Sequence, residues 1–277
     1  LEAGPRYSKN VERALDFILK RVEASADNGL AITDVQGTQI QRKLGPYIDT
    51  FLTSMLLAKI DGTLSPALNA RVRKGLEKCV SKIERNQQRD GSWNISGGWA
   101  PILGTSMASR SLFEASQKGV KVEDRVMRRA EDYTVMALNS PGQTIGGGDG
   151  VALSARDASA GVALYQSAQA LEQLSRTPED RQKNAASISR IQSQLSDSSF
   201  VAGFGSMGGE EFFSYLNVSD SLQRSGGPQW KQWHSQIVQK LVNLQNNDGT
   251  WAGHHCITGR VAVTSAAILN LAVDHAI

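Results

Sequence analysis

The amino-acid sequence predicts an all-α fold, an α/α toroid of about five outer/inner helix pairs. Three observations support this prediction. A short phrase occurs at residues 86–93 and again at 244–251, each time before a Gly-rich loop and an apolar helical stretch. Amphipathic segments alternate with more apolar ones at a period of about 53 residues. No strand pattern of comparable length competes.

The repeated phrase reads Asn-Gln-Gln-Arg-Asp-Gly-Ser-Trp in its first copy and Leu-Gln-Asn-Asn-Asp-Gly-Thr-Trp in its second. Asp-Gly predicts a tight turn, because glycine tolerates backbone angles that other residues avoid. The flanking Gln and Trp can tie this turn to the end of the preceding helix. We therefore expect Trp93 and Trp251 to be structural residues.

Five amphipathic segments are predicted to form the outer helices, since their apolar residues recur at helical spacing and their opposite faces are charged. Their apolar positions are Leu15, Ile18, Leu19 and Val22; Val72, Leu76, Val80 and Ile83; Val126, Tyr133 and Ala137; Ile188, Ile191 and Leu195; and Trp230, Trp233, Ile237, Leu241 and Leu244. The charged face of each of these helices should be exposed to solvent.

Five further segments are rich in Ala, Ser, Thr, Leu and Gly and carry few charges, so they are predicted to form the inner helices. They cover residues 47–60, 104–117, 158–175, 211–225 and 261–275. Each inner helix can be buried only against its neighbours, which favours a closed ring and a single domain over 1–277. An open superhelix of helix pairs is the alternative.

The connections that lead from an outer to an inner helix are long, and the reverse connections are short. The long ones cover 26–45, 87–103, 139–157, 196–210 and 247–260. In a toroid they would all meet at one mouth, where function is expected to concentrate. The N-termini of the inner helices would face the same mouth and favour an anionic ligand.

The composition limits the classes of molecule that the protein is expected to bind. The 30 basic and 27 acidic side chains are spread along the 277 residues, which excludes the clustered basic surface of a nucleic-acid-binding protein. No apolar run is long enough for a transmembrane segment. Cys79 and Cys256 lie far apart and indicate no disulfide framework. The chain begins with Leu1, which suggests a mature or excised form; its compartment, its oligomeric state and any cofactor are left open.

The Gln-x-x-Asp-Gly-(Ser/Thr)-Trp phrases before Ala-rich helices resemble the QW motifs of squalene and oxidosqualene cyclases. The period of the helix pairs is similar to that of protein prenyltransferase β subunits. The resemblance is specific in two repeats, 84–118 and 243–273, and implies the terpenoid cyclase/prenyltransferase-like toroid.

The reactions of these families are not implied. The Asp-x-Asp-Asp motif of the class II cyclases is absent, and the positions matching the prenyltransferase zinc ligands, around 211–213 and 263–264, do not reproduce them. The Gly-Cys-Gly-Glu-Gln motif of the thioester domains with this fold is also missing. The resemblance therefore indicates a divergent member, whose reaction the sequence does not give.

Glu211 and Tyr215 form the leading catalytic hypothesis. They stand four residues apart at the start of a predicted inner helix, so they share one helix face and can act as an acid/base pair if that face looks into the barrel. The structural alternative is that Glu210 and Glu211 interact favourably with the dipole of their own helix.

The last long loop contains His254, His255 and Cys256, which could supply a thiolate nucleophile and a base at the rim of the same cavity. Zinc held by Glu211, His254 and Cys256 is a weaker alternative, because the usual ligand spacing is missing. Hydrogen-bonded loop residues are the structural interpretation.

Arg156 and Arg260 precede the third and fifth inner helices and are predicted to anchor a phosphate, diphosphate or carboxylate. Glu210, Asp157 and Trp99 are further candidate ligand contacts. Aromatic residues are only 6% of the chain, which favours a polar ligand over a bare polyene.

The sequence thus predicts a toroid that binds or acts on a small polar or anionic ligand in its central cavity. Two alternatives stay open: a carbohydrate-acting toroid, either hydrolase or lyase, and a non-catalytic interaction module.

Overall fold

The protein is described by a computed structural model that covers residues 8–38, 41, 45–93, 95, 101–139, 160–201, 208–254 and 257–275. Helices dominate these ranges and no strand occurs in them, which confirms the predicted all-α class. The sequence predicted one domain over 1–277. The chain forms two compact units, Leu1–Tyr133 and Thr134–Ile277, each with its own packing.

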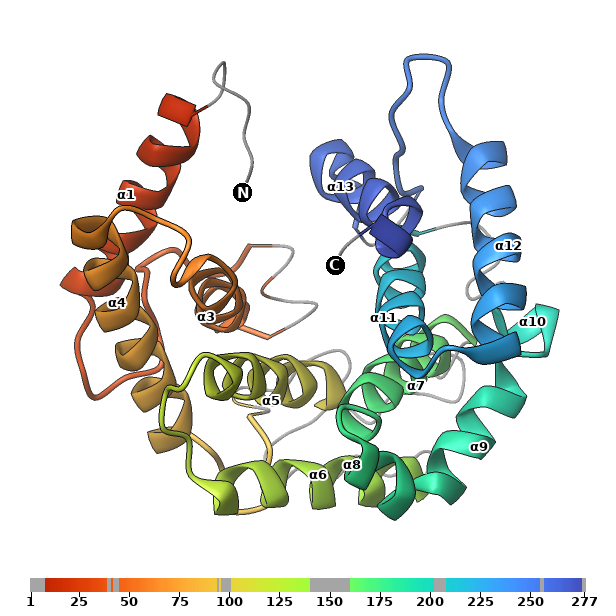
Figure 1. Ribbon diagram of the computed structural model, residues 1–277, viewed down its shortest axis with the longest axis horizontal. Helices are drawn as coiled ribbons and strands as arrows, with labels where there is room; N and C mark the ends of the chain where they lie inside the picture. The colour runs from red at the N-terminus through yellow and green to blue at the C-terminus, as the bar shows by residue number, and fades with distance from the viewer. Residues whose placement is uncertain are drawn as a thin grey trace. The chain divides into compact units, whose positions relative to one another are not determined.

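Unit 1 consists of two layers of helices. Its helices are α1 (Ser8–Ala24), α3 (Ile48–Ile60), α4 (Pro66–Arg85), α5 (Pro101–Gln117) and the first part of α6 (Asp124–Asn139). The predicted inner helices α3 and α5 lie side by side, and α4 packs on both of them and on α1 (Figure 1). Leu19, Leu57 and Leu76 meet in the core and are fully buried.

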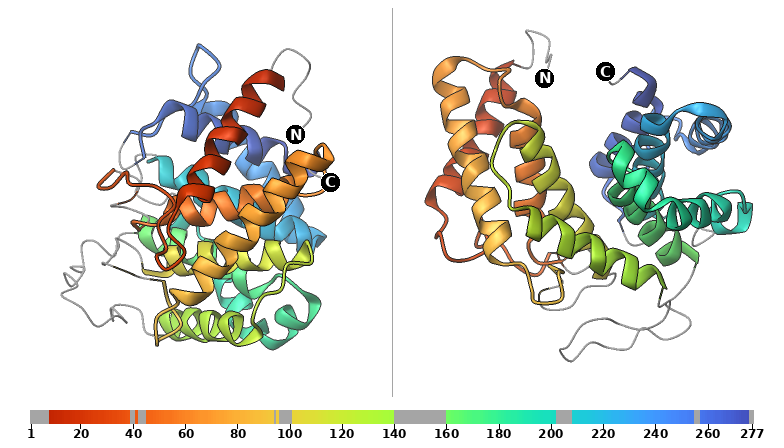
Figure 2. Two further views of the ribbon diagram at one scale, coloured as in Figure 1. Left: turned by 90° about the vertical axis from the view of Figure 1, so that its left-hand side faces the viewer. Right: turned by 60° about the horizontal axis from the view of Figure 1, so that its bottom comes forward.

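Unit 2 repeats this arrangement. Its helices are α7 (Ala160–Leu174), α8 (Pro178–Lys183), α9 (Ala185–Gln194), α10 (Ser198–Val201), α11 (Gly209–Ser225), α12 (Gly227–Leu244), α13 (Arg260–Leu271) and the 3-10 helix η1 (Val273–His275). α11 lies between α7 and α13, as Figures 1 and 2 show. α12 packs on α11 and α13, while α9 and α10 pack on α7.

Most helix bounds agree with the sequence pattern. The predicted inner helix 211–225 is α11, which begins two residues earlier at Gly209. The predicted inner helix 261–275 is shorter than expected, because α13 ends at Leu271 and the chain continues as η1.

The fourth outer helix departs from the prediction. Its α8 begins with a capping box at Thr177, whose hydroxyl accepts the Asp180 N–H while the Asp180 carboxylate accepts the Thr177 N–H. α8 ends before Asn184, and α9 follows as a separate helix. The short helix α10 then lies in the stretch 196–210 that was predicted to be a loop.

The two copies of the repeated phrase form the same structure. The Trp93 indole donates a hydrogen bond of 2.7 Å to the carbonyl of Ile83 on α4. The Trp251 indole donates one of 2.8 Å to the carbonyl of Leu241 on α12. Both tryptophans are buried, so each indole fastens the turn to the last part of the preceding outer helix.

The turns themselves also match. The Gln87 side chain donates to the carbonyl of Gly91 at 3.0 Å, and the Gln245 side chain donates to that of Gly249 at 2.9 Å. The two glycines have φ angles of 91° and 79°, a region that L-residues rarely adopt. The phrase is therefore a structural device, as its sequence predicts.

Trp251→Ala should lower the free energy of unfolding by about 3–5 kcal/mol, because a large buried side chain and its hydrogen bond to α12 are both lost. Thermal and urea unfolding measure the change. Trp230→Ala is the control: Trp230 lies on α12 but is only partly buried, so its loss should cost clearly less. Equal effects of the two substitutions would contradict the structural role of the phrase.

Candidate functional site

Glu211 and Tyr215 occupy the first two turns of α11, on one face of the helix. Their relative exposures are 1% and 0%, so both groups lie inside unit 2. The side chain of the neighbouring Glu210 lies outside the described residues.

Contacts of Tyr215 show where this face points. Its hydroxyl donates a hydrogen bond of 2.8 Å to the carbonyl of Val201 at the end of α10. Its ring meets the edge of Trp233 on α12, with 6.0 Å between the ring centroids. The face therefore packs against α10 and the outer helix α12.

These surroundings determine the protonation of the Tyr215 hydroxyl. Burial, and then the negative charge of Glu211, raise the pKa of Tyr215 above its usual range. The phenol stays protonated and donates to a main-chain carbonyl, so it positions α11 against α10 rather than exchanging protons with a ligand.

Lys240 is the cation next to this pair. It extends from α12 and places its ammonium 5.5 Å from the centroid of the Tyr215 ring, within the range of a cation–π contact. Burial lowers the pKa of Lys240, and the Glu211 carboxylate offsets part of that effect. Sequence reasoning did not single out Lys240, because an isolated lysine on an outer helix is usually solvated.

A cavity of about 240 Å³ opens beside Lys240 in unit 2. Its lining residues come from α9, α10, α11, α12 and the residues directly after α9. The lining residues are Gln192, Leu195, Ser196, Val201, Leu222, Gln229, Gln232, Trp233, Gln236 and Lys240. They include four glutamines, one serine and one lysine, and no carboxylate.

A buried hydrogen-bond chain holds Trp233, one of the lining residues of this cavity. The Trp233 indole donates to the Ser219 hydroxyl at 3.0 Å, and this hydroxyl donates to the Asn270 side chain at 3.0 Å. Asn270 in turn donates to the carbonyl of Phe212 at 3.0 Å. The chain connects α12, α11 and α13, so the helix that carries Lys240 is held rigidly.

The last long loop reaches the start of α11. A Cβ atom on Gly209 would overlap the carbonyl oxygen of Ile257, and one on Gly253 would overlap the same atom. Only glycines allow this approach of main chain to main chain. His254 is nevertheless exposed, whereas Glu211 is buried. His255 and Cys256 lie outside the described residues, so their predicted convergence with Glu211 is not described.

Arg260, a predicted anion anchor, is bound to another group. Its guanidinium lies 2.5 Å from the Asp248 carboxylate of the repeated turn. The Thr250 hydroxyl and N–H, followed by Arg260, lower the pKa of Asp248 to about 2. Arg260, the first residue of α13, thus connects this helix to the turn that follows α12. The other predicted ligand contacts, Arg156, Asp157 and Trp99, lie outside the described residues.

Metal ligation was the weaker sequence hypothesis. Within the part of the chain that the structure describes, no group of three or more His, Cys, Asp or Glu side chains is placed to hold a metal ion. Of the proposed ligands, Cys256 lies outside that part.

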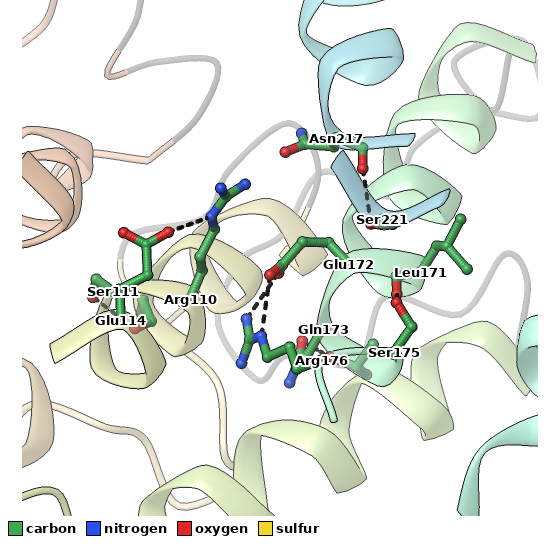
Figure 3. Close-up of polar contacts among 12 residues, drawn as sticks. Arg110, Ser111, Glu114, Leu171, Glu172, Gln173, Ser175, Arg176, Asn217 and Ser221 are labelled. Atoms are coloured by element: carbon green, nitrogen blue, oxygen red, sulfur yellow. Dashed lines mark hydrogen bonds and ion pairs between the residues drawn. The ribbon is translucent and has the colours of Figure 1, made fainter. Parts of the chain in front are cut away.

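A second buried charge cluster, in unit 2, was not predicted. Arg176, just after α7, makes two hydrogen bonds to Glu172, of 3.1 and 2.8 Å, and both side chains are almost fully buried (Figure 3). Arg224 of α11 approaches Glu172 at 3.8 Å and pairs with Asp220 at 2.9 Å. The i, i+4 spacing of both pairs was the available signal. The cluster joins α7 to α11.

Comparison of the chain with protein-family models, with curated proteins and with solved structures gave no match. The terpenoid cyclase/prenyltransferase-like family thus stays a prediction from the repeated phrases. A separate search of the described residues found no helix with the length and hydropathy that crossing a bilayer requires.

Tyr215 should not ionise near pH 10 in the folded protein, since burial raises its pKa. The absorbance difference at 295 nm between wild type and Tyr215→Phe should stay flat through that pH in buffer. It should show one titrating tyrosine in concentrated urea. An equal titration in both solvents would contradict the burial of the hydroxyl.

The same shift predicts a loss of stability in alkali. Because the folded pKa of Tyr215 lies above the unfolded one, its contribution is complete below the unfolded pKa and falls as pH rises through the folded pKa. Tyr215→Phe should therefore lose less stability than wild type above about pH 10.

Proposed function

We propose that this protein binds a small anionic ligand in the cavity of unit 2, and that Lys240 holds the negative charge of that ligand. One observation carries the proposal. Among the described residues, no hydrogen bond or ion pair engages the Lys240 ammonium, although it lies at the wall of a polar cavity.

Electrostatics favour an anion at this position. A partly buried ammonium loses part of its hydration, which is why the pKa of Lys240 is lowered. A bound carboxylate or phosphate would restore a charge-assisted hydrogen bond. None of the described residues that line the cavity is a carboxylate. The charge of the neighbouring Glu211 acts on Lys240, but Glu211 is not among these lining residues.

The proposal keeps the ligand class that the sequence predicts and changes its location. The sequence placed the anion at the mouth formed by the long loops, with Arg156 and Arg260 as anchors. Arg260 is paired with Asp248, and the observed cavity lies beside the outer helix α12. Binding is the function supported here, because the hydroxyl of Tyr215 is already bound to Val201.

We also propose that the helix pairs form the closed α/α toroid that their period implies. Support comes from within each unit, where inner helices contact each other in chain order and each carries an outer helix. The apolar residues Val261, Ile268 and Leu269, exposed on α13, are the kind of face that ring closure covers. Small-angle scattering should give a radius of gyration of about 19 Å; a clearly larger value would favour the open superhelix.

Lys240→Gln should weaken the binding of inorganic phosphate about 10- to 100-fold, because one charge-assisted hydrogen bond is lost. Isothermal titration calorimetry at low ionic strength measures this effect with the least screening. Lys231→Gln is the matched control, since Lys231 is exposed on the same helix and does not line the cavity. The affinity of the Lys231→Gln variant for phosphate should equal that of wild type.

Sulfate, which does not titrate in this range, tests the pH dependence. Its binding should weaken as pH rises through the lowered pKa of Lys240, below the pH at which an ordinary lysine loses its charge. The Lys240→Gln variant should melt no lower than wild type at neutral pH, since it removes a partly buried charge. Undiminished phosphate binding by Lys240→Gln would overturn the proposal.

A further inference from the structure

Three glutamines form a row along α12 that leads to Lys240. Gln229, Gln232 and Gln236 are spaced by three and four residues, so they share one face of the helix with Lys240, four residues further on. At 1.5 Å per residue the row from Gln229 to Lys240 is about 16 Å long. Gln192 of α9 and Ser196 add polar groups to the same cavity.

Each of these neutral groups both donates and accepts hydrogen bonds. A side-chain amide offers two N–H donors and a carbonyl acceptor, and a serine hydroxyl does both with one oxygen. Ligand hydroxyls also donate and accept hydrogen bonds, so they can pair with these glutamines whichever way each amide group is turned. Inorganic phosphate is small and offers mainly acceptor oxygens, so it would leave most of the amides to water.

Part of the cavity lining is apolar. It consists of Leu195, Val201, Leu222 and Trp233. A volume of about 240 Å³ falls below the 300 to 1,000 Å³ typical of sites for drug-sized ligands. The cavity thus accommodates a ligand of about one sugar ring, with its C–H groups on the aliphatic side chains.

We propose that the ligand is a polyhydroxylated monosaccharide with one anionic group, a sugar acid or a sugar phosphate. The inference rests on the proposed anion site at Lys240 and adds the hydroxyl-bearing part of the ligand. Lys240 is the single cation among the described lining residues, which matches a single anionic group. The amide of Gln236, about one turn before Lys240, and that of Gln232, about one turn further away, bind the hydroxyls of the ligand.

Calorimetry with four probes separates the contribution of the anionic group to the affinity from that of the ligand hydroxyls. The probes are glucuronate, glucose 6-phosphate, glucose and inorganic phosphate. At least one of the two sugar anions should bind about tenfold or more tightly than both glucose and phosphate, because it alone uses Lys240 and the amides together. The tighter of the two sugar anions identifies a carboxylate or a phosphate as the anionic group.

Gln232→Leu and Gln236→Leu test the amides directly. Each should reduce the affinity for the preferred sugar anion about three- to tenfold and leave phosphate binding unchanged. Gln239→Leu is the matched control, since Gln239 lies on α12 outside the cavity and bonds to Asn243. Circular dichroism and melting temperature report whether each variant is folded.

The outcomes are distinguishable. If phosphate binds at Lys240 as tightly as both sugar anions, or if the glutamine variants bind sugar anions like wild type, the inference of a hydroxylated ligand is overturned and the anion site stands. If none of the four probes binds, or if Lys240→Gln leaves all affinities unchanged, the anion site and the inference are both overturned.

Discussion

The hydrogen bond from the Trp251 indole to the carbonyl of Leu241 is the constraint on which the proposed site depends. Leu241 directly follows Lys240, so the bond fixes the turn of α12 that carries the cation. The Trp251 main-chain N–H is held in turn by the Thr264 hydroxyl on α13, at 3.0 Å. A phrase repeated for structural reasons thereby sets the position of the cavity wall.

The charged side chains inside unit 2 have two kinds of surroundings. Glu172 is held by Arg176 in two hydrogen bonds and approached by Arg224, so that its charge is balanced within the protein. Lys240 makes no hydrogen bond or ion pair among the described residues: it has an aromatic face and a polar cavity beside it, and the Glu211 charge offsets only part of the effect of its burial. A buried charge that is balanced internally serves packing, whereas one that faces a cavity can be balanced by a ligand. This contrast is the physical reason for placing the site at Lys240.

The helices and the turns could be predicted from the sequence because their causes are local. The low-charge composition of the inner segments predicts the start of α11 to within two residues, and Asp-Gly with its flanking Gln and Trp predicts the two matching turns. The toroid itself, which depends on contacts between distant helices, stays a prediction.

The cavity could not be predicted from the sequence, and the reason differs from the one given for the toroid. Its glutamines lie on the polar face of an outer helix, where a residue that binds a ligand and one that faces only water have the same pattern. Lys240 acquires its surroundings from Tyr215 and Trp233, and Arg260 is paired with Asp248, twelve residues away. Glu211 and Tyr215 share a helix face as predicted, but only tertiary packing shows that this face meets α10 and α12.

The decisive measurement is a crystal structure of the protein soaked with the tightest-binding anion. We expect an anionic oxygen at about 2.7–2.9 Å from the Lys240 Nζ atom, with the rest of the ligand along Gln232 and Gln236. An anion bound only at the loops before the inner helices, with water alone beside Lys240, would contradict it.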